Sequence, residues 1–135
     1  AVGTDQWVVH NCGVGPASDR AEQLGDEATP GFRRSWATIG VADVQEADGT
    51  VNRIISISRK ASPTLRNTLR VALDPAERFI GSSGEHAEDA ILEYVGTEEA
   101  PNAGRKLLSI GVSNGFCDRC GPMMMDAWPS LFGGV

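Results

Sequence analysis

The sequence contains few cysteines and no long apolar run. Three cysteines occur among 135 residues, and two of them form the close pair Cys117 and Cys120. This pattern excludes the even, scattered framework of a disulfide-stapled secreted domain and raises metal binding or redox chemistry instead. No stretch of about 18 apolar residues is present, so no segment is expected to span a membrane. The N-terminus also lacks the basic and apolar segments of a secretion signal.

The sequence is also short of positive charge. Its formal net charge is -6, which argues against nonspecific nucleic-acid binding, because such binding needs a basic surface that neutralises phosphates. The sum hides three local basic pairs, which are Arg33-Arg34, Arg59-Lys60 and Arg105-Lys106. These pairs either line one side of the fold or are scattered, solvated charges, and the sequence leaves both interpretations open.

Length and apolar content predict one folded domain. With 135 residues, 41% of them hydrophobic, the chain can bury one core but is too short to divide into two. Residues 1–15 contain a short apolar run, then His10-Asn11-Cys12 and a glycine-rich break. We expect this segment to be a linker, and the folded domain to span residues 16–135.

The first half of the domain predicts a helix followed by a β-hairpin. Residues 17–28 have a weak amphipathic pattern that fits a helix. The segments 35–46 and 51–59 are strand-like, and Asp48-Gly49 between them is a favourable hairpin turn.

Two Xaa-Pro pairs then predict helix starts. Ser62 followed by Pro63 fits the N-cap and first residue of a helix with an apolar stripe. Asp74 and Pro75 repeat the signal and predict a short helical turn that continues through Phe79.

The second half predicts a helix over about 85–95, a buried strand over 107–112 and a last helix over about 117–128. The order of hairpin, helix, strand and helix indicates an α/β structure with helices packed on a sheet. Pro129 and the glycines that follow predict a compact C-terminus without a further long element.

Three side chains have the spacing of a zinc site. Cys117 and Cys120 are three residues apart at the start of a predicted helix, so both sulfurs face the same way and can hold one ion at about 2.3 Å. His86, in the first turn of another predicted helix, supplies a nitrogen. Three protein ligands leave the fourth tetrahedral position for water, as in a catalytic rather than a structural zinc site. Helix N-termini also favour thiolate over thiol.

Glu88 has the position of a proton carrier. It lies two residues beyond His86, which on a helix turns it about 200° around the axis, so it is not placed to ligate the same ion. A zinc ion lowers the pKa of its water toward ~7, and a neighbouring carboxylate can accept that proton and deliver it to a leaving group. We therefore expect Glu88 to act as general base and acid.

Together, His86-x-Glu88 and Cys117-x-x-Cys120 resemble the signature of the cytidine deaminase superfamily. The resemblance covers about residues 35–128 and lies in content, order and context combined. It implies a three-layer fold, in which helices cover both faces of a mixed sheet, and one catalytic Zn²⁺. It also implies hydrolytic deamination, in which zinc-activated hydroxide attacks the carbon that bears the amino group and the glutamate protonates the ring nitrogen and the departing ammonia.

The resemblance also implies a nucleobase as the substrate. We expect cytosine to be converted to uracil in nucleic acid, DNA ahead of RNA, with an unpaired or flipped base in the zinc site. Deamination of RNA is one alternative. Deamination of free cytidine or nucleotides is another, which the acidic charge favours, and adenine remains open. Phe116 stands where many family members have a proline, and we expect zinc binding to tolerate it.

Six residues are candidate substrate contacts. Arg119 can meet a phosphate, and Trp36 and Phe116 can stack on a base. The others, which can hydrogen-bond a sugar or a base edge, are Asn52, Ser113 and Asn114. The structural alternatives are solvation for the arginine, core packing for the aromatic residues and turn formation for Asn114.

A second resemblance lies at the N-terminus. Residues 8–12, Val-Val-His-Asn-Cys, resemble the end of an intein-like autoprocessing domain, which commonly precedes toxin domains in bacterial polymorphic toxins. This resemblance implies that Cys12 begins a released toxin and that residues 1–11 are a remnant. It further implies a delivered effector that acts in the target-cell cytoplasm, and a cognate immunity protein. The alternative is an ordinary strand end with a surface cysteine.

Two other interpretations of the cysteines remain. Cys12 can complete a closed site with Cys117, Cys120 and His86, which would make a zinc-stabilised binding module rather than an enzyme. In that case Glu88 would have no role. A thioredoxin-like redox pair is disfavoured, because no strand leads directly into such a motif near the N-terminus.

Overall fold

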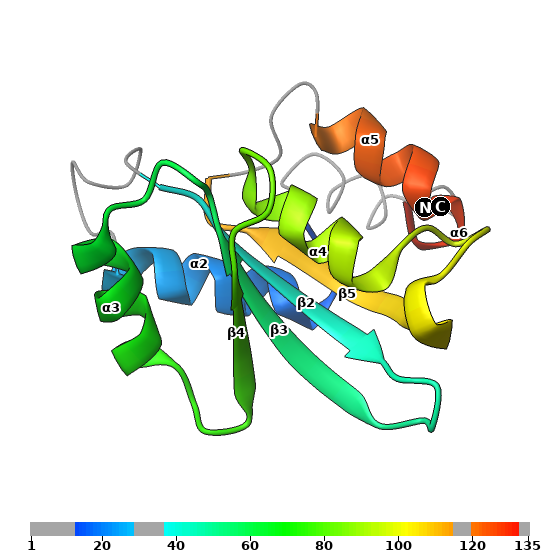
Figure 1. Cartoon of the computed structure of the whole chain (residues 1–135), viewed down its shortest axis with the longest axis horizontal. Helices are drawn as coiled ribbons and strands as arrows, with labels where there is room; N and C mark the ends of the chain where they lie inside the picture. The colour runs from blue at the N-terminus through cyan, green and yellow to red at the C-terminus, as the bar shows by residue number, and fades with distance from the viewer. Residues whose placement is uncertain (1–12, 29–36, 115–119, 133–135) are drawn as a thin grey trace, which may run out of the picture.

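The computed structural model describes residues 13–28, 37–114 and 120–132, and Figure 1 shows their arrangement. The elements in chain order are β1 (Gly13–Val14), α2 (Pro16–Ala28), β2 (Ile39–Gln45), β3 (Val51–Ile57), α3 (Pro63–Ala72), β4 (Glu77–Gly81), α4 (Ala87–Val95), η2 (Asn102–Gly104), β5 (Lys106–Val112), α5 (Cys120–Ala127) and α6 (Pro129–Phe132). The strands form one five-stranded sheet in the order β1-β5-β2-β3-β4. The pair β3 and β4 is parallel, and the other pairs are antiparallel.

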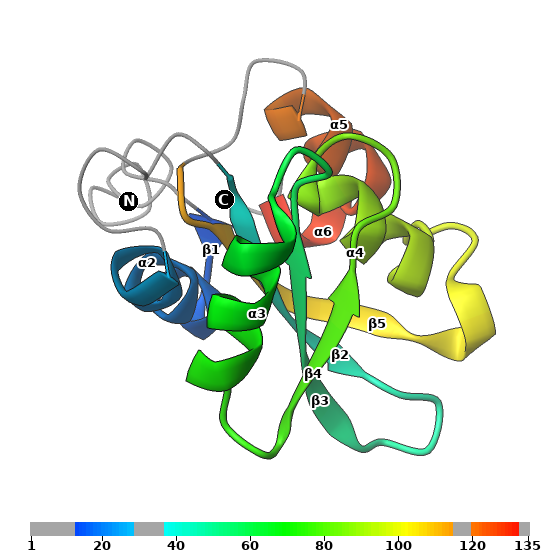
Figure 2. The ribbon, with the colours of Figure 1, turned by 60° about the vertical axis from the view of Figure 1, so that its left-hand side comes forward.

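Helices cover both faces of this sheet, which gives three layers. Helices α2 and α3 pack on one face, and α4, α5 and α6 lie on the other (Figures 1 and 2). The α/β class with a mixed sheet and helices on both faces is therefore confirmed. Among the described residues, no helix has the length and apolar character needed to cross a membrane.

The alternation of side chains along the strands divides the core into two apolar clusters. On the face of α2 and α3, the larger buried side chains are Leu24, Ile39, Val41, Ile55, Ile57, Leu65 and Leu69. On the face of α4 and α5, they are Val44, Ile54, Ile91, Val95, Leu107, Ile110, Met124 and Trp128. Both faces of β2 and β3 are thus buried, and polar side chains on these strands must bond within the protein.

The predicted hairpin is confirmed, with its turn at Asp48 and Gly49. The N–H of Glu46 donates to the carbonyl of Thr50 at 2.7 Å, and Gly49 has a φ of 92°. This left-handed conformation favours glycine, because a side chain there meets steric resistance. The predicted N-cap Ser62 is also confirmed, since its Oγ accepts a hydrogen bond from the N–H of Leu65 at 3.2 Å.

The helical turn predicted from Asp74 and Pro75 through Phe79 is wrong. The two residues begin a tight turn, in which the N–H of Glu77 donates to the carbonyl of Asp74 at 2.9 Å. The chain then enters the edge strand β4, where Phe79 pairs with Ile55. Pairing with a distant strand thus overrides the local helix signal, which an Asp-Pro turn imitates.

The sheet begins before the predicted domain boundary. Gly13 and Val14 pair with Gly111 and Ile110 of β5, so part of the segment expected to be a linker belongs to the sheet. At the other end of the chain, the compact C-terminus takes the form of the short helix α6.

Candidate active site

One end of the sheet gathers the segments from which the sequence predicts a site. Strands β3, β4 and β5 all point toward this end, because β3 and β4 are parallel and β2 is antiparallel to both β3 and β5. Helices α4 and α5 begin there (Figures 1 and 2). In open α/β sheets, the ends of the strands are where ligands commonly bind. We call this the site end, and the opposite end the hairpin end.

His86 and Glu88 occupy the start of α4. His86 is the N-cap residue, with an extended backbone (φ -105°, ψ 155°), rather than a member of the first helical turn as predicted. Glu88 lies in the first turn, and only 2% of its surface is exposed. Ala87, the one residue between them, is where the backbone changes from extended to helical. The start of α4 thus carries a buried glutamate two positions after a half-buried histidine, two residue types that can move protons.

Residues of strands β2 and β3 contact the first turn of α4 and fix its position on the sheet. The buried Oγ of Ser56 donates to the carbonyl of Ala87 at 2.8 Å. Gly40 lies beside Ser56, and a Cβ at Gly40 would be 2.5 Å from that Oγ and 3.2 Å from the Cβ of Ala87. The backbone between His86 and Glu88 therefore rests directly on the sheet, with room for no additional atom.

Asp89, within α4, holds the backbone just before the same turn. Its Oδ2 accepts hydrogen bonds from the N–H of Glu85 at 3.1 Å and from the N–H of His86 at 3.0 Å. These bonds satisfy two backbone donors at the helix start, as in a capping box. Gly84, with a φ of 71°, allows the preceding loop to turn, and a Cβ there would lie 2.7 Å from Asp89 Oδ2.

Ser113 and Asn114 anchor the chain where β5 ends. Ser113 Oγ accepts a hydrogen bond from the N–H of Ile39 at 2.9 Å, and the N–H of Ser113 donates to the carbonyl of Ile39. The amide of Asn114 donates to the carbonyl of Ala37 at 3.0 Å and to Oγ1 of Thr38 at 3.2 Å. Both residues lie at the site end, and these bonds tie the segment toward Cys117 to the start of β2.

Several predicted residues lie outside the described part of the chain. These are Trp36, Phe116, Cys117 and Arg119. Cys120 begins α5, so one predicted ligand stands at a helix start of the site end. Within residues 13–28, 37–114 and 120–132, no three histidine, cysteine or acidic side chains form a group that holds a metal.

Asn52 is not brought to the site. It lies near the start of β3, at the hairpin end, and its amide donates to Oε2 of Glu46 at 2.9 Å. Four residues of strand separate it from Ser56, which corresponds to about 13 Å. Glu46 also accepts bonds from Arg105 at 2.8 Å and from Tyr94 at 2.7 Å. The three bonds, that of Arg105 foremost, lower the pKa of Glu46 to about 2.

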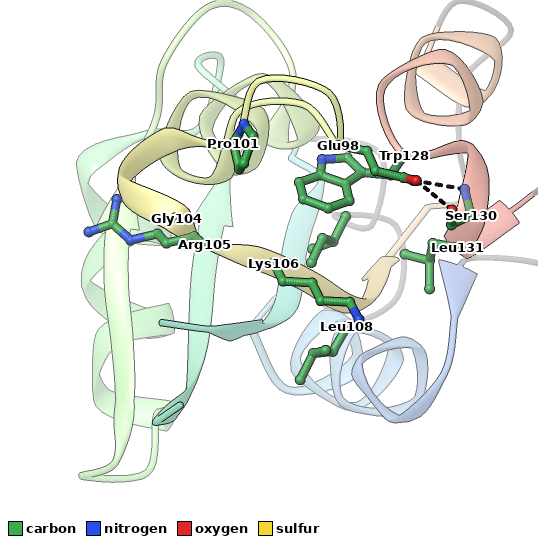
Figure 3. A pocket seen from close by; sticks show the side chains of 10 residues that line it. Glu98, Pro101, Gly104, Arg105, Lys106, Leu108, Trp128, Ser130 and Leu131 are labelled. Carbon is green, nitrogen blue, oxygen red and sulfur yellow. Dashed lines mark hydrogen bonds between the residues drawn. The ribbon is translucent and has the colours of Figure 1, made fainter. Parts of the chain in front are cut away.

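A cavity of about 570 Å³ lies beside the first residues of β5, toward the hairpin end (Figure 3). Lys106, Leu108 and Trp128 line it, and Glu98 binds Ser130 at its rim. None of the candidate ligands or substrate contacts lines this cavity. Trp128 is 4% exposed and donates its ring N–H to the carbonyl of Gly96 at 2.9 Å, so it is a core residue.

The sequence interpretation missed the residues that hold the turn. Ser56 and Gly40 have no local signal, because their importance comes from the helix that packs on them. Asp89 did have one, since an acidic residue three positions after a helix N-cap fits a capping box. Comparison with protein-family models, with curated proteins and with solved structures finds no match for this chain.

Proposed function

We propose that this protein is a zinc-dependent deaminase that converts cytosine to uracil, with DNA as the favoured substrate. The observation that carries the proposal is the position of Glu88. Glu88 is only 2% exposed at the start of α4, two residues after His86 and at the same end of the sheet as Cys120. A carboxylate is costly to bury, and its place next to an imidazole gives it a role in proton transfer.

The proposed metal ligands are His86, Cys117 and Cys120. One imidazole nitrogen and two thiolates form a donor set that suits zinc, and three protein ligands leave one position open. The structure supports this set at two points, because His86 and Cys120 each stand at the start of a helix at the site end. When bound, zinc lowers the pKa of water and thus supplies a nucleophile at neutral pH.

Glu88 moves the protons in the proposed reaction. Its carboxylate accepts the proton of the attacking water and passes it to the ring nitrogen of the base. It then delivers the second proton to the amino group, which leaves as ammonia. Ser56, Gly40 and Asp89 keep the backbone around Glu88 in place, so that the carboxylate needs little rearrangement during the two transfers.

The finer assignments follow from the sequence resemblances. We propose a cytidine-deaminase-like fold and a toxin domain that is delivered into the cytoplasm of a target cell and blocked by an immunity protein. RNA and free cytidine are the alternative substrates. The three-layer α/β architecture supports the fold assignment, because the resemblance implies the same layers.

The proposal is tested with the zinc-loaded protein and its Glu88→Gln variant. Each is incubated with single-stranded DNA, duplex DNA, RNA and free cytidine, and conversion of C to U is read by sequencing or mass. We expect the variant to keep one zinc per chain and to lose about 10²- to 10⁴-fold in rate, the usual contribution of a general acid and base.

Glu99→Gln is the matched control, because Glu99 is exposed and lies outside the site end. It should react like the wild type. If Glu88→Gln were as active as the wild type, Glu88 would not carry protons. If no substrate were converted while zinc was bound, adenine substrates would be tested next, and their failure would leave a zinc-stabilised binding module.

A further inference from the structure

Positive charge is concentrated in one stretch of this acidic chain. Residues 49–73 contain five of the twelve basic residues and none of the eighteen acidic residues. The stretch includes β3, the loop after it and α3. A net charge of -6 therefore does not describe the electrostatic potential near this segment, which is set by its own cations.

The loop that follows β3 places two of these cations beside the site. Arg59 and Lys60 are exposed, and the N–H of Arg59 donates to the carbonyl of Glu85 at 3.0 Å. Glu85 directly precedes His86. The loops before α3 and before α4 lie next to each other at the site end (Figures 1 and 2). Arg59 is therefore bonded to the residue that precedes a proposed zinc ligand, and Lys60 follows it in the same loop.

Arg66, in helix α3, adds a third cation next to the same loop. Its guanidinium donates to the carbonyls of Ala61 and Arg59, each at 3.3 Å. Within the described part of the chain, no carboxylate lies within ion-pair distance of Arg59 or Arg66. Among the described residues, the charge of these two cations is therefore not neutralised by an ion pair.

Other arginines of the protein are used differently. Arg20 pairs with Glu77 at 2.6 Å, Arg53 with Asp43 at 2.7 Å, and Arg105 with Glu46 at 2.8 Å. Each of these guanidiniums is committed to a carboxylate of the fold. The pairs Arg59-Lys60 and Arg105-Lys106 therefore do not share one surface, since Arg105 belongs to the hairpin end, and Arg33-Arg34 lies outside the described residues.

We propose that Arg59, Lys60 and Arg66 form a phosphate-binding strip that holds the phosphodiester backbone next to the base in the active site. The inference rests on the proposed function and narrows its substrate to a nucleic-acid strand rather than a free nucleoside. Guanidinium groups suit this ligand, because their N–H donors match two phosphate oxygens at once. Such contacts position a strand without reading its sequence.

The test measures binding separately from catalysis. The zinc-loaded Glu88→Gln protein, which does not consume substrate, is titrated into labelled DNA and RNA oligonucleotides of the same sequence, and anisotropy is recorded at several salt concentrations. Arg59→Gln/Lys60→Gln is compared with Arg78→Gln/Lys106→Gln, which removes two exposed charges from β4 and β5. Arg59→Lys/Lys60→Arg keeps both charges of the strip.

We expect the strip variant to bind more weakly and to lose about 2 from the slope of log K against log salt, about one per phosphate contact. The β4 and β5 control and the charge-preserving variant should retain the slope. The inference is overturned if the strip variant binds as the unmodified protein does, or if that protein binds neither DNA nor RNA. It is also overturned if polyglutamate competes as well as an oligonucleotide of equal charge.

These outcomes are independent of the proposed chemistry. A protein that converts cytosine and binds oligonucleotides without help from the strip would keep its proposed function and lose this inference. A protein that binds oligonucleotides through the strip but converts no base would keep the inference about phosphate and lose the deaminase. DNA and RNA arms then show whether the sugar matters, because the 2′-hydroxyl is what differs between them.

Discussion

The two ends of the sheet satisfy their polar groups in different ways. At the hairpin end, side chains bond to side chains, because Glu46 accepts from Arg105, Tyr94 and Asn52. In this cluster the three donors all bond to the carboxylate of Glu46, and its charge is paired with that of Arg105. It stabilises the fold and offers little to a ligand.

At the site end, side chains bond to backbone instead. Ser56 holds a carbonyl of α4, Asp89 holds two amides before it, and Ser113 holds the start of β2. Such bonds fix the backbone of loops and leave the side chains of His86 and Glu88 out of these contacts. The polar groups of one end thus maintain the fold, whereas those of the other end hold the backbone in place around the proposed site.

The largest effect is expected where the frame meets the sheet. Gly40→Ala places a Cβ against Ser56 Oγ and the first turn of α4, so we expect a loss of about 1–3 kcal/mol in unfolding free energy and a fall in deamination. Ser56→Ala should cost about 0.5–1.5 kcal/mol, because it removes one buried hydrogen bond to the carbonyl of Ala87. Urea unfolding and rate measurements on the zinc-loaded protein check both.

The double variant Gly40→Ala/Ser56→Ala sharpens this prediction. Because Ser56→Ala removes the nearest clashing atom, the double variant should lose less unfolding free energy than the sum of the two single losses, by about 0.5 kcal/mol or more. Strictly additive costs would mean that the turn does not rest on the sheet as described. Thr68→Ala is the control, since its hydroxyl also donates to a carbonyl, at 2.9 Å, but on an exposed helix face.

A smaller effect is expected at the hairpin end, and it depends on pH. The pKa of Glu46 is lowered to about 2 in the folded protein by its bond to Arg105 and by two further donors. A carboxylate with a lowered pKa stabilises the fold above its unfolded pKa, and this stabilisation is lost as the pH falls toward the folded pKa. Glu46→Gln should therefore be less stable than the wild type at pH 6.

The difference between Glu46→Gln and the wild type should shrink below about pH 4.5 and become small near pH 2, where about half of the wild-type carboxyl is protonated. Urea titrations at several pH values measure it, and comparing two proteins with the same zinc site cancels the acid loss of metal. A difference that persisted unchanged at low pH would show that the carboxylate charge is not what stabilises this end.

The smallest effect is expected for Asn52→Ala. The sequence makes Asn52 a candidate substrate contact, but the structure places it with Glu46 at the hairpin end. We expect deamination to stay at the wild-type rate and stability to fall by about 1 kcal/mol, the usual value of one hydrogen bond. A strong loss of activity with normal stability would break the distinction between the two ends.

Local signals predicted most elements of the fold. The turn at Asp48 and Gly49, the cap at Ser62 and the periodicity of α4 are local patterns, and each marks the element that forms. Strand β4 was missed because it depends on parallel pairing with β3, which no short segment encodes. His86 was placed one step too far into its helix, since histidine is not a typical N-cap residue.

The candidate site was predicted in part for the same reason. The spacing of His86, Glu88 and Cys120 is a property of the chain, and the structure adds that the helices which carry them start at one end of the sheet. Asn52 was chosen by chemistry alone, because a strand's sequence does not tell which of its ends faces a site. The residues that position the turn depend on contacts between distant elements.

The order of the strands also determines when the sheet can form during synthesis of the chain. Strand β5 lies between β1 and β2, so the sheet cannot close until residues 106–112 have left the ribosome. The hairpin of β2 and β3 is complete about 55 residues earlier, and at about 5–20 residues per second the outer edge of β2 stays unpaired for several seconds. An open edge is a template for wrong pairing, and during this interval the nascent chain is at its most vulnerable to aggregation.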